Sequence, residues 1–323
     1  MSKKPLISII IPVAPEAGYV TTVSRIRKST IPKNQYEVII VFGNQPSVQR
    51  NEAVKKSRGD IIYFLDNDSM PDKGNLKRII QFFRTHKKAA ILGGPSLSAH
   101  DSTSFEQQAG MALGSFFGSA QSKARYSQTG KARPASEMEL ILCNMAVKKN
   151  IFLKAGMFNK NLYPNEENEL INRIKDLVYE VWYDPEFVVY RHHRKNIFQF
   201  MKQIFTYGRG RADQFFAQKG KGTVFPIISL GFVIYLLFFS GFISLPLWSY
   251  IILNLSFSFY MMVQAGKVLL YLPFLFFIIH SFYGLGFLSG LFLKAALLIQ
   301  GRSFRTAPKK SIWYRIQWIK DRV

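Results

Sequence analysis

Residues 60–68 read DIIYFLDND, an apolar run of mainly β-branched and aromatic residues that ends in two aspartates. A continuous apolar run of this length is typical of a strand that is buried on both faces of a sheet. Two similar runs precede it, ISIIIPV at residues 7–13 and YEVIIVF at residues 36–42, and a helical spacer follows each. Strands that alternate with helices predict an α/β fold with parallel strand pairing.

The end of this strand carries the first candidate site. In open α/β sheets, ligands bind at the carboxyl ends of the strands, which is where Asp66, Asn67 and Asp68 fall. Two carboxylates separated by one residue can hold a divalent cation and the diphosphate attached to it, and oxygen ligands of this hardness favour Mg²⁺ or Mn²⁺. The alternative is an Asx-rich turn between a strand and a helix, because a D-x-D pattern also occurs by chance.

The remaining pattern predicts further alternation up to residue 193. Residues 100–134 are rich in Ser, Gly, Gln and Ala, which favours loops and a helix that line a cleft. The predicted helices are 19–27, 48–57, 75–85 and 165–177, and the predicted strands are 89–95, one in 138–158 that is followed by a short helix, and a final strand in 180–193.

Composition excludes several classes of protein. The chain has 323 residues, of which 48% are hydrophobic, so it is not a disordered protein. Its single cysteine, Cys143, excludes an internal disulfide and a cysteine-rich zinc site. The first residues lack the long apolar stretch of a signal peptide, so we expect the N-terminal part to stay in the cytosol.

Residues 223–300 form an apolar block with only two charged residues, Lys267 and Lys294, which predicts a transmembrane region. Candidate spans are 225–243, 245–263 and 268–300; the last is either one overlong span or a pair broken at 284–290. The glycines of that last segment also suit close packing between helices. Four short spans, or two spans and a re-entrant segment, are favoured over three.

The favoured even number follows from the charge on either side of the apolar block. Residues 191–222 carry eight basic residues against Asp213, and residues 301–323 carry seven against Asp321. Basic flanks favour the cytoplasmic side, so both ends of the block are expected there. The net charge of +23 gathers beside the membrane segment, where anionic lipids would attract it, and this argues against a nucleic-acid partner. Residues 196–216 form a basic and aromatic helix that suits the bilayer surface.

Four blocks in order resemble the family 2 glycosyltransferases of the GT-A fold. They are ISIIIPV, YEVIIVF, VQRNEAVKKSRGDIIYFLDNDSMPDKGNL and NEENELINRI, within residues 5–195. The following VVYRHHRKNIFQFMKQIFTYGRGRA and the apolar C-terminal region are similar to the membrane-bound subgroup that resembles the succinoglycan glucosyltransferase ExoA. The resemblance implies an α/β GT-A domain, which is a Rossmann-like nucleotide-diphospho-sugar transferase fold, followed by interfacial helices and a transmembrane region. The implied boundaries are 1–195 for the GT-A domain, 196–222 for the interface segment, 223–300 for the transmembrane region and 301–323 for a basic cytoplasmic tail.

The resemblance also implies a metal and diphosphate site at Asp66 and Asp68, with Mg²⁺ or Mn²⁺ as the cofactor. His192 follows the last predicted strand, where related enzymes often place a histidine near the metal. The alternative for His192 is a basic cluster that faces lipid headgroups, because arginines and a lysine surround it.

The nucleotide side is implied at Pro12, Asn44, Arg50 and Asn51, together with Asp66 and Asn67. For Arg50 the alternative is a solvated charge on a helix. The chain departs from the family at residues 42–45, where Phe-Gly-Asn-Gln replaces the Asp-Asp-Gly-Ser that binds uracil. Asn44 can still bond to a pyrimidine, but another nucleobase or a lipid-phosphate sugar donor stays open.

The implied catalytic base lies in the acidic pair of NEENELINRI. An inverting transferase needs one base that takes the proton of the acceptor hydroxyl. Glu167 occupies the family's base position, while Glu166 is the alternative because a glutamate arm is longer than the usual aspartate. The competing interpretation is an acidic first turn that stabilises a helix.

A third implied group lies in QIFTYGRGR. Gln203, Arg209 and Arg211 are similar to the Gln-x-x-Arg-Trp element of processive relatives, which contacts the acceptor and the diphosphate. The tryptophan is absent and the spacing differs, which leaves processivity open. An arginine that binds the leaving diphosphate is chemically reasonable in either case.

Together these features predict a multi-pass, membrane-anchored inverting glycosyltransferase at the cell (inner) membrane, with its catalytic domain in the cytoplasm. Its expected partners are a nucleotide-sugar donor, a polyprenyl-phosphate-linked or polysaccharide acceptor, and membrane lipids. A polysaccharide export channel and a non-catalytic membrane scaffold with a degenerate transferase domain are the alternatives. The few polar residues of the apolar block argue against the channel, and Asp66, Asp68 and Glu167 argue against the scaffold.

Overall fold

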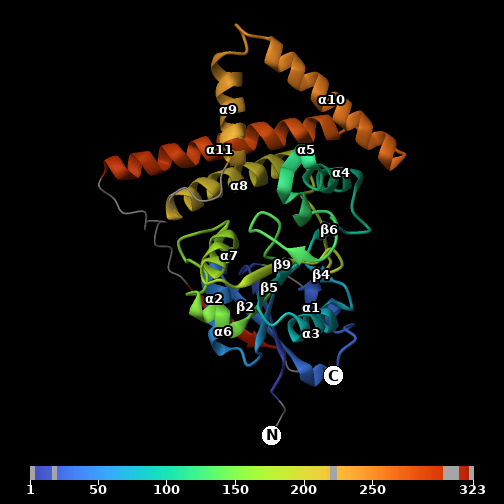
Figure 1. Ribbon diagram of the computed structural model, residues 1–323, viewed down its shortest axis with the longest axis vertical. Helices are drawn as coiled ribbons and strands as arrows, with labels where there is room; N and C mark the ends of the chain where they lie inside the picture. The colour runs from blue at the N-terminus through green and yellow to red at the C-terminus, as the bar shows by residue number, and fades with distance from the viewer. Residues whose placement is uncertain (1–3, 17–19, 219–223, 301–312, 320–323) are drawn as a thin grey trace. The chain divides into compact units, whose positions relative to one another are not determined.

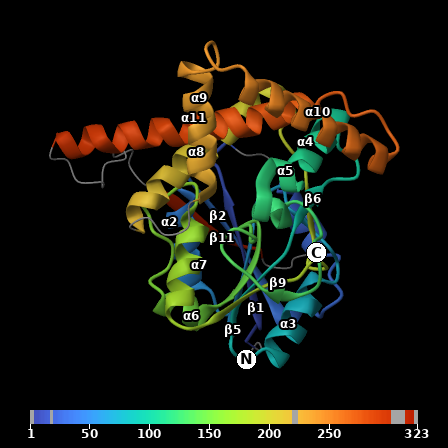
Figure 2. The same ribbon diagram turned by 45° about the horizontal axis from the view of Figure 1, so that its top comes forward.

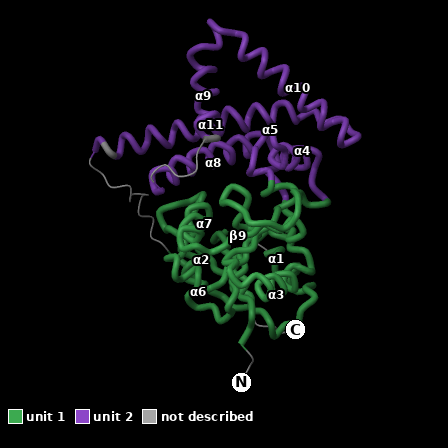
Figure 3. Tube along the Cα trace, in the orientation of Figure 1, with its two compact units in different colours: residues 1–100, 124–191, 307–323 green, residues 101–123, 192–306 purple. Residues whose placement is uncertain are grey.

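The computed structural model describes residues 4–16, 20–218, 224–300 and 313–319, and the chain divides into two compact units (Figure 3). Unit 1 comprises Met1–His100, Ala124–Arg191 and Ala307–Val323, and unit 2 comprises Asp101–Lys123 and His192–Thr306. The division differs from the expected boundaries in two places: residues 101–123 belong with the C-terminal helices, and the end of the chain belongs with unit 1.

Unit 1 is built on an eight-stranded sheet with the order β11-β2-β1-β3-β8-β5-β9-β7 (Figure 1). β1 pairs in parallel with both β2 and β3, so the carboxyl ends of these three strands share one edge. β8 is antiparallel to β3 and β5. The strands are β1 (Ile7–Val13), β2 (Tyr36–Gly43), β3 (Ile61–Leu65), β5 (Ala89–Gly93), β7 (Arg133–Pro134), β8 (Asn144–Lys148), β9 (Glu180–Tyr183) and β11 (Tyr314–Trp318).

The prediction of parallel pairing is therefore confirmed for the first three strands and wrong for β8. Helical crossovers connect β1 to β2 and β2 to β3, and such crossovers impose parallel strands. β8 is reached instead after the long excursion that begins beyond β6, so no crossover rule fixes its direction.

The predicted final strand at 180–193 is also wrong as a single element. β9 ends at Tyr183, and Asp184 then begins a turn in which its carboxylate accepts the backbone N–H of Glu186 at 2.9 Å. The chain resumes as β10 (Val189–Arg191) in a second sheet of order β4-β10-β6, with β4 at Met70–Pro71 and β6 at Ser96–Ser98.

Helices cover both faces of the large sheet. Ala53, Phe152 and Leu170 belong to one buried cluster, whereas Ile26 and Ile79 belong to the other. The first three lie on α2, α6 and α7, and the last two lie on α1 and α3, so unit 1 has three layers. The helices are α1 (Thr21–Ile26), a 3-10 turn at Lys33–Gln35, α2 (Pro46–Lys56), α3 (Asn75–Thr85), α6 (Lys149–Lys154) and α7 (Glu166–Asp176).

The end of the chain completes this sheet. Residues 314–318 form β11, which pairs antiparallel with β2 from Tyr314↔Gly43 to Trp318↔Ile39. A basic tail was expected here, and its parts at 301–312 and 320–323 lie outside the described residues. The described part is an edge strand of the large sheet.

Unit 2 is helical. Its long helices α8 (Ile197–Ala217) and α11 (Leu272–Ile299) pack side by side, while α9 (Val224–Phe238) and α10 (Leu245–Ala265) form a hairpin (Figures 1 and 2). Two shorter helices, α4 (Ser104–Leu113) and α5 (Phe116–Ser119), complete the unit, and a 3-10 segment at Ala120–Arg125 runs across the boundary with unit 1. Residues 219–222 of the expected interface segment lie outside the described residues.

By length and composition, two described helices could cross a membrane, namely α10 and α11. The helix α9 is also apolar, but it is shorter than these two candidate membrane-spanning helices. α11 continues without a break through residues 284–290, which leaves the single overlong segment of the two expected alternatives.

Candidate active site

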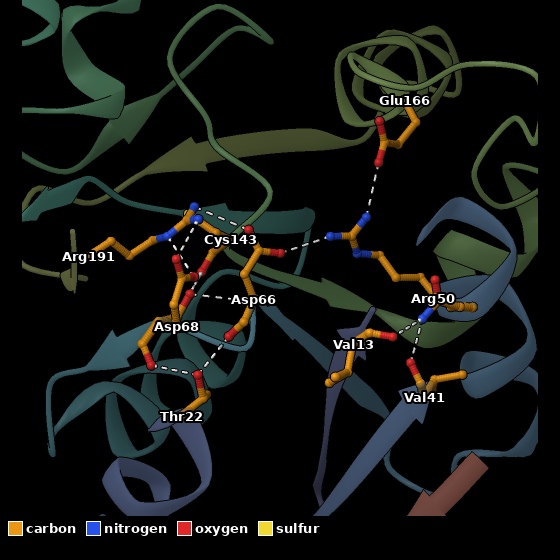
Figure 4. Close-up of polar contacts among 11 residues, drawn as sticks. Val13, Thr22, Val41, Arg50, Asp66, Asp68, Cys143, Glu166 and Arg191 are labelled. Carbon is orange, nitrogen blue, oxygen red and sulfur yellow. Dashed lines mark hydrogen bonds and ion pairs between the residues drawn. The ribbon is translucent and has the colours of Figure 1, made fainter. Parts of the chain in front are cut away.

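The two aspartates lie where the sequence predicts them, directly beyond the carboxyl end of β3 (Figure 4). The turn that carries them is held by Thr22, whose hydroxyl donates to the backbone carbonyls of Asp66 at 2.7 Å and Ser69 at 2.8 Å. The Ser69 hydroxyl in turn accepts the backbone N–H of Asp66 at 3.1 Å. These contacts fix the turn and leave the carboxylate of Asp68 half-exposed (47%) at the sheet edge.

Arg191 is the cation that both aspartates contact. Its Nε lies 3.0 Å from Oδ1 of Asp68, and its Nη1 lies 3.2 Å from Oδ2 of Asp66. The second sheet explains this placement, since Tyr190 of β10 pairs with Met70 of β4, which follows the aspartate turn. In the sequence, Arg191 stands only in a basic cluster beside His192, and that pattern does not indicate this role.

Arg50 joins the aspartates to the acidic helix. It lies on α2 with its side chain only 6% exposed, donating from Nη2 to Oδ1 of Asp66 at 2.9 Å and from Nη1 to Oε1 of Glu166 at 3.0 Å. Its Nε is buried and makes no hydrogen bond among the described residues. Arg50 is therefore not the solvated helix charge that the sequence left as an alternative.

Gln49 is a second residue whose role the sequence analysis missed. Its side-chain amide donates to the backbone carbonyls of Val13 at 3.0 Å and Val41 at 2.5 Å, at the carboxyl ends of β1 and β2. β2 lies on one side of β1 in the sheet and β3 lies on the other, so the order of the strands reverses beside β1. Open α/β sheets bind ligands at such a switch point. Gln49 thus fixes the strand ends that border the predicted crevice.

Glu166 and Glu167 form the first turn of α7, and both are buried. Burial and the neighbouring charge of Glu167 raise the pKa of Glu166 to about 8, although Arg50 opposes this change. Among the described residues, the carboxylate of Glu167 makes no hydrogen bond or ion pair with a side chain. Glu166 is thus occupied by Arg50, whereas the carboxylate of Glu167 is available.

The other residues that were predicted on the nucleotide side differ in their positions and contacts. Asn51 is buried and bonds through its amide to both backbone groups of Phe158, at 2.8 and 3.0 Å, so it joins α2 to the loop before α7. This structural role contradicts the expectation that Asn51 faces the nucleotide. Asn44 lies just beyond β2, and its Oδ1 is 3.5 Å from the backbone N of Trp313. Pro12 lies within β1 and Asn67 between the two aspartates.

The remaining predicted site residues belong to unit 2. His192 lies between two carboxylates, with Nε2 3.3 Å from Asp101 and Nδ1 3.4 Å from Glu106. The Gln203 amide donates to the Tyr207 hydroxyl at 2.7 Å.

The two arginines of the GRGR sequence face different surroundings. Arg209 is exposed on α8, whereas Arg211 is buried and donates to Gln214 at 2.9 Å. Residues two positions apart on a helix point to different faces, so Arg209 and Arg211 do not act as a pair.

Residues 42–155 match the family described as Glycosyl transferase family 2. The match spans about a third of the chain, and this part is similar to a family 2 glycosyltransferase domain. Its fold is the α/β GT-A fold, followed by C-terminal helices of which two are long and apolar. No curated protein sequence matches the chain.

Two solved structures illustrate what the chain is similar to. Mannosyltransferase PcManGT from Pyrobaculum calidifontis, in complex with GDP-Man and Mn²⁺, is 15% identical with a TM-score of 0.49, and the match covers 68% of this chain and 66% of that one. S. aureus TarS 1-349, in complex with UDP-GlcNAc, is 14% identical with a TM-score of 0.46, and 96% of each chain is covered.

The donor set of the family 2 domain fits a divalent cation bound by two carboxylates. Asp66 and Asp68 supply hard oxygen ligands, and Mg²⁺ commonly uses one or two carboxylates and takes its other ligands from phosphate and water. Within the described ranges, no three His, Cys, Asp or Glu residues are placed to hold a metal together. The expected third ligand, His192, instead lies between Asp101 and Glu106. Arg191, the last residue of β10, contacts the aspartates, and neighbouring residues of an extended chain point to opposite sides.

Proposed function

We propose that the chain is a membrane-anchored inverting glycosyltransferase that moves a sugar from a nucleotide-diphosphate sugar to a lipid-linked or polysaccharide acceptor. The observation that carries the proposal is the Arg50 bridge. One buried guanidinium contacts both Asp66, on the diphosphate side, and Glu166, beside the candidate base. This contact joins the end of β3 in the central sheet to the first turn of α7 in one hydrogen-bonded network, as a transfer site would require.

On the donor side, Asp66 and Asp68 would hold Mg²⁺ or Mn²⁺, which neutralises charge on the diphosphate when it is bound. Arg191 contacts both carboxylates and adds a fixed positive charge beside them. Preorganised cations of this kind stabilise the negative charge that develops on a leaving diphosphate. Arg50 and Arg191 are therefore the residues of this chain that would assist departure of the nucleoside diphosphate.

On the acceptor side, Glu167 takes the proton of the acceptor hydroxyl. The acceptor oxygen forms its bond to the anomeric carbon, while the bond from that carbon to the diphosphate oxygen breaks on the opposite face. Glu166 is tied to Arg50 and carries a raised pKa, which makes it the weaker candidate for an ionised base at neutral pH. These two properties of Glu166 favour Glu167 as the catalytic base.

Asn44 is the candidate for reading the nucleobase, because it lies beyond β2 at the ligand-binding edge of the sheet. A carboxamide can both donate and accept hydrogen bonds, so it suits uracil as well as guanine. Gln203 and the exposed Arg209 are proposed for acceptor or diphosphate contacts.

The proposal places the chain in the membrane-bound subgroup that resembles ExoA, with the catalytic unit on the cytoplasmic side of the cell membrane. Its support is the apolar hairpin α9–α10, the apolar face of α11 and the basic residues of α8. A polyprenyl-linked acceptor suits this arrangement, because such a lipid stays in the bilayer where these helices would lie.

The test is a transfer assay with the purified chain in detergent, a panel of uridine and guanosine nucleotide sugars, and Mg²⁺ or Mn²⁺. Polyprenyl-linked and polysaccharide acceptors are added separately, and nuclear magnetic resonance reports the anomeric configuration of the product. We expect one donor to give a product of inverted configuration that requires the acceptor. A retained configuration would contradict the role of Glu167, and no product with any donor would contradict the proposed function.

A further inference from the structure

The hairpin of α9 and α10 has an unusual tip. Residues 239–244 read FSGFIS, and the whole segment from 224 to 265 contains no charged residue and no histidine. Phe242 at the tip is 90% exposed, and Phe239, Ile243 and Leu245 beside it are also exposed. A tip that emerged into water on the far side of a membrane would expose these side chains to solvent, at a cost that grows with the apolar area.

The backbone of the tip is satisfied from within the hairpin. The Tyr235 hydroxyl donates to the carbonyl of Ile243 at 2.6 Å and accepts the N–H of Leu247 at 3.0 Å. The N–H groups of Phe242 and Ile243 both donate to the carbonyl of Phe239. In hydrocarbon, no water is present to bond such groups, so internal partners are required there and are optional in water.

The hairpin is also too short to cross a bilayer from α11. The first helix of the hairpin, α9, contacts α11 at Gly284. A Cβ atom added to this glycine would lie 2.2 Å from the carbonyl of Ser229 in α9. On the descending side, Tyr250 of α10 bonds to His280 of α11 at 2.9 Å. Between Ser229 and the end of α9 the helix rises only about 14 Å, whereas the hydrocarbon core is about 30 Å thick.

One side of α11 contacts helices that carry polar groups, from its beginning to its end. At its beginning, the backbone N–H of Tyr271 donates to Gln108 of α4, and the His280 ring lies 2.8 Å from the Phe117 carbonyl of α5. Farther along, Gly286 lies against the Phe205 carbonyl of α8, and Lys294 pairs with Asp213 at 2.8 Å. If α11 crossed a bilayer, it would carry these polar helices with it.

α8 is the element that most clearly excludes such a crossing. It contains Lys202, Arg209, Arg211 and Asp213, and each charge within the hydrocarbon would cost several kcal/mol. Lys202 and Arg209 are exposed, as expected beside anionic headgroups. The opposite side of α11 exposes Phe274, Phe277 and Phe292, which suits contact with lipid. The pair α8–α11 therefore fits the surface of the bilayer.

The connection of the chain agrees with this arrangement. After α11 the chain returns to unit 1, where β11 pairs with β2 of the catalytic sheet. Residues on the two sides of the helical segment thus belong to one sheet and must lie in one compartment. Three apolar helices that each crossed the membrane would place them in different compartments.

We propose that unit 2 enters a single leaflet: the α9–α10 hairpin inserts its tip as far as the middle of the bilayer and returns, α8 and α11 lie along the surface, and no described helix crosses. The partner is the hydrocarbon of the leaflet that faces the catalytic unit. This inference depends on the membrane anchoring in the proposed function but not on the transfer reaction.

The test uses single introduced cysteines. The native Cys143 is buried, and burial raises the pKa of its thiol, so it gives a low labelling background. Phe242→Cys and Gly241→Cys report on the tip, and a Cβ at Gly241 meets nothing within 4 Å. Lys87→Cys, on the surface of unit 1, and Gln317→Cys, on β11, are the controls for the catalytic side.

An impermeant maleimide is added to spheroplasts and to inverted vesicles from cells that express each variant. We expect both controls to react from the same side, and the tip cysteines to react from neither side until detergent is added. A fluorophore on Gly241→Cys, in vesicles of phosphatidylcholine and phosphatidylglycerol, should be quenched most by nitroxides near the ends of the acyl chains. Labelling of the tip from the side opposite Lys87→Cys would show a crossing and overturn the proposal.

Two other results would also overturn it. Labelling from the same side as Lys87→Cys would show that the tip stays in water. Shielding without quenching by any lipid nitroxide would show that the tip is covered by protein. None of these readouts needs transferase activity, so an inactive but inserted chain would contradict the proposed function while supporting this inference.

Discussion

Glu166 and Glu167 are adjacent in the sequence, but their carboxylates differ in what they contact. Glu166 receives a hydrogen bond from Arg50 at 3.0 Å, and its pKa is raised to about 8, first by burial and then by Glu167. Glu167 has no side-chain partner among the described residues. Burial and the adjacent carboxylate therefore both favour the protonated form of Glu166 near neutral pH.

Replacement of each residue by glutamine separates their roles. Glu167→Gln keeps the shape of the side chain but cannot accept a proton, so we expect kcat to fall by about 10²–10⁴ with little change in donor binding. Glu166→Gln should reduce kcat less. The measurement is steady-state turnover together with donor affinity for both variants. If Glu166→Gln has the larger effect, the base lies one residue upstream of our assignment.

The raised pKa of Glu166 also predicts a pH dependence of stability. The pKa of this carboxyl is 4.5 in the unfolded chain and about 8 in the folded state. Between these two pH values the folded state keeps a proton that the unfolded chain has already released. The stabilisation is fully present below 4.5 and is lost as the pH rises through about 8. Thermal unfolding of wild type and Glu166→Gln in detergent, over this pH range, should show a steeper decline for wild type. Parallel curves would contradict the assignment.

For single residues of the site, the sequence predicted the positions of the acidic side chains better than those of the basic ones. Asp66, Asp68, Glu166 and Glu167 follow recognisable strand and helix boundaries, so a local pattern locates them. The partners of Arg191 are more than a hundred residues away in the chain, and β10 reaches them only because the turn at Asp184 diverts the strand into the second sheet. No local pattern contains that information.

The packing of α8 against α11 depends on glycines at the level of helices. A Cβ at Gly286 would lie 2.0 Å from the Phe205 carbonyl, and one at Gly208 would lie 2.1 Å from the Tyr283 carbonyl. The expectation of close packing at the small residues of 284–290 is confirmed. The length of α11 was consistent with one overlong span, but only the contacts with α8 show that one side of it is covered.

Substitution of these glycines tests the packing. Gly286→Leu should force α8 and α11 apart and destabilise unit 2 by about 1–3 kcal/mol or more, which is the usual cost of overpacking. Gly231→Leu on α9 is the matched control, because a Cβ there meets nothing within 4 Å. Thermal unfolding of both variants in detergent gives the comparison. Equal melting temperatures would show that the helices do not pack through Gly286.

The order of the sheet shows the limit of prediction for strands. β1, β2 and β3 could be placed because helical crossovers fix their direction. β11 could not, since its sequence YRIQW lies in a basic segment and its pairing with β2 is formed across most of the chain. The sequence therefore predicted a tail where the structure has an edge strand.

For the molecule as a whole, the pairing of β11 with β2 predicts the sidedness of both ends of the helical segment. Reporter fusions after Gly222 and after Val323 should report the same compartment, because residues 124–191 before the helices of unit 2 and β11 after them both belong to unit 1. Activity of a cytoplasmic reporter at both positions is the expected result. Opposite sidedness would require an odd number of crossings and would be incompatible with β11 in the catalytic sheet.

The carboxylates beyond β3 are proposed to support glycosyl transfer from a nucleotide sugar. The most direct measurement is the release of nucleoside diphosphate by wild type, Asp68→Ala and Asp60→Ala, with the same donor, acceptor and Mn²⁺. Asp60 is the matched control, because it lies at the opposite end of the same strand and pairs with Lys4 at the surface. The account predicts release by wild type and Asp60→Ala, and release at the protein-free level by a folded Asp68→Ala. Turnover of Asp68→Ala close to that of wild type would contradict it.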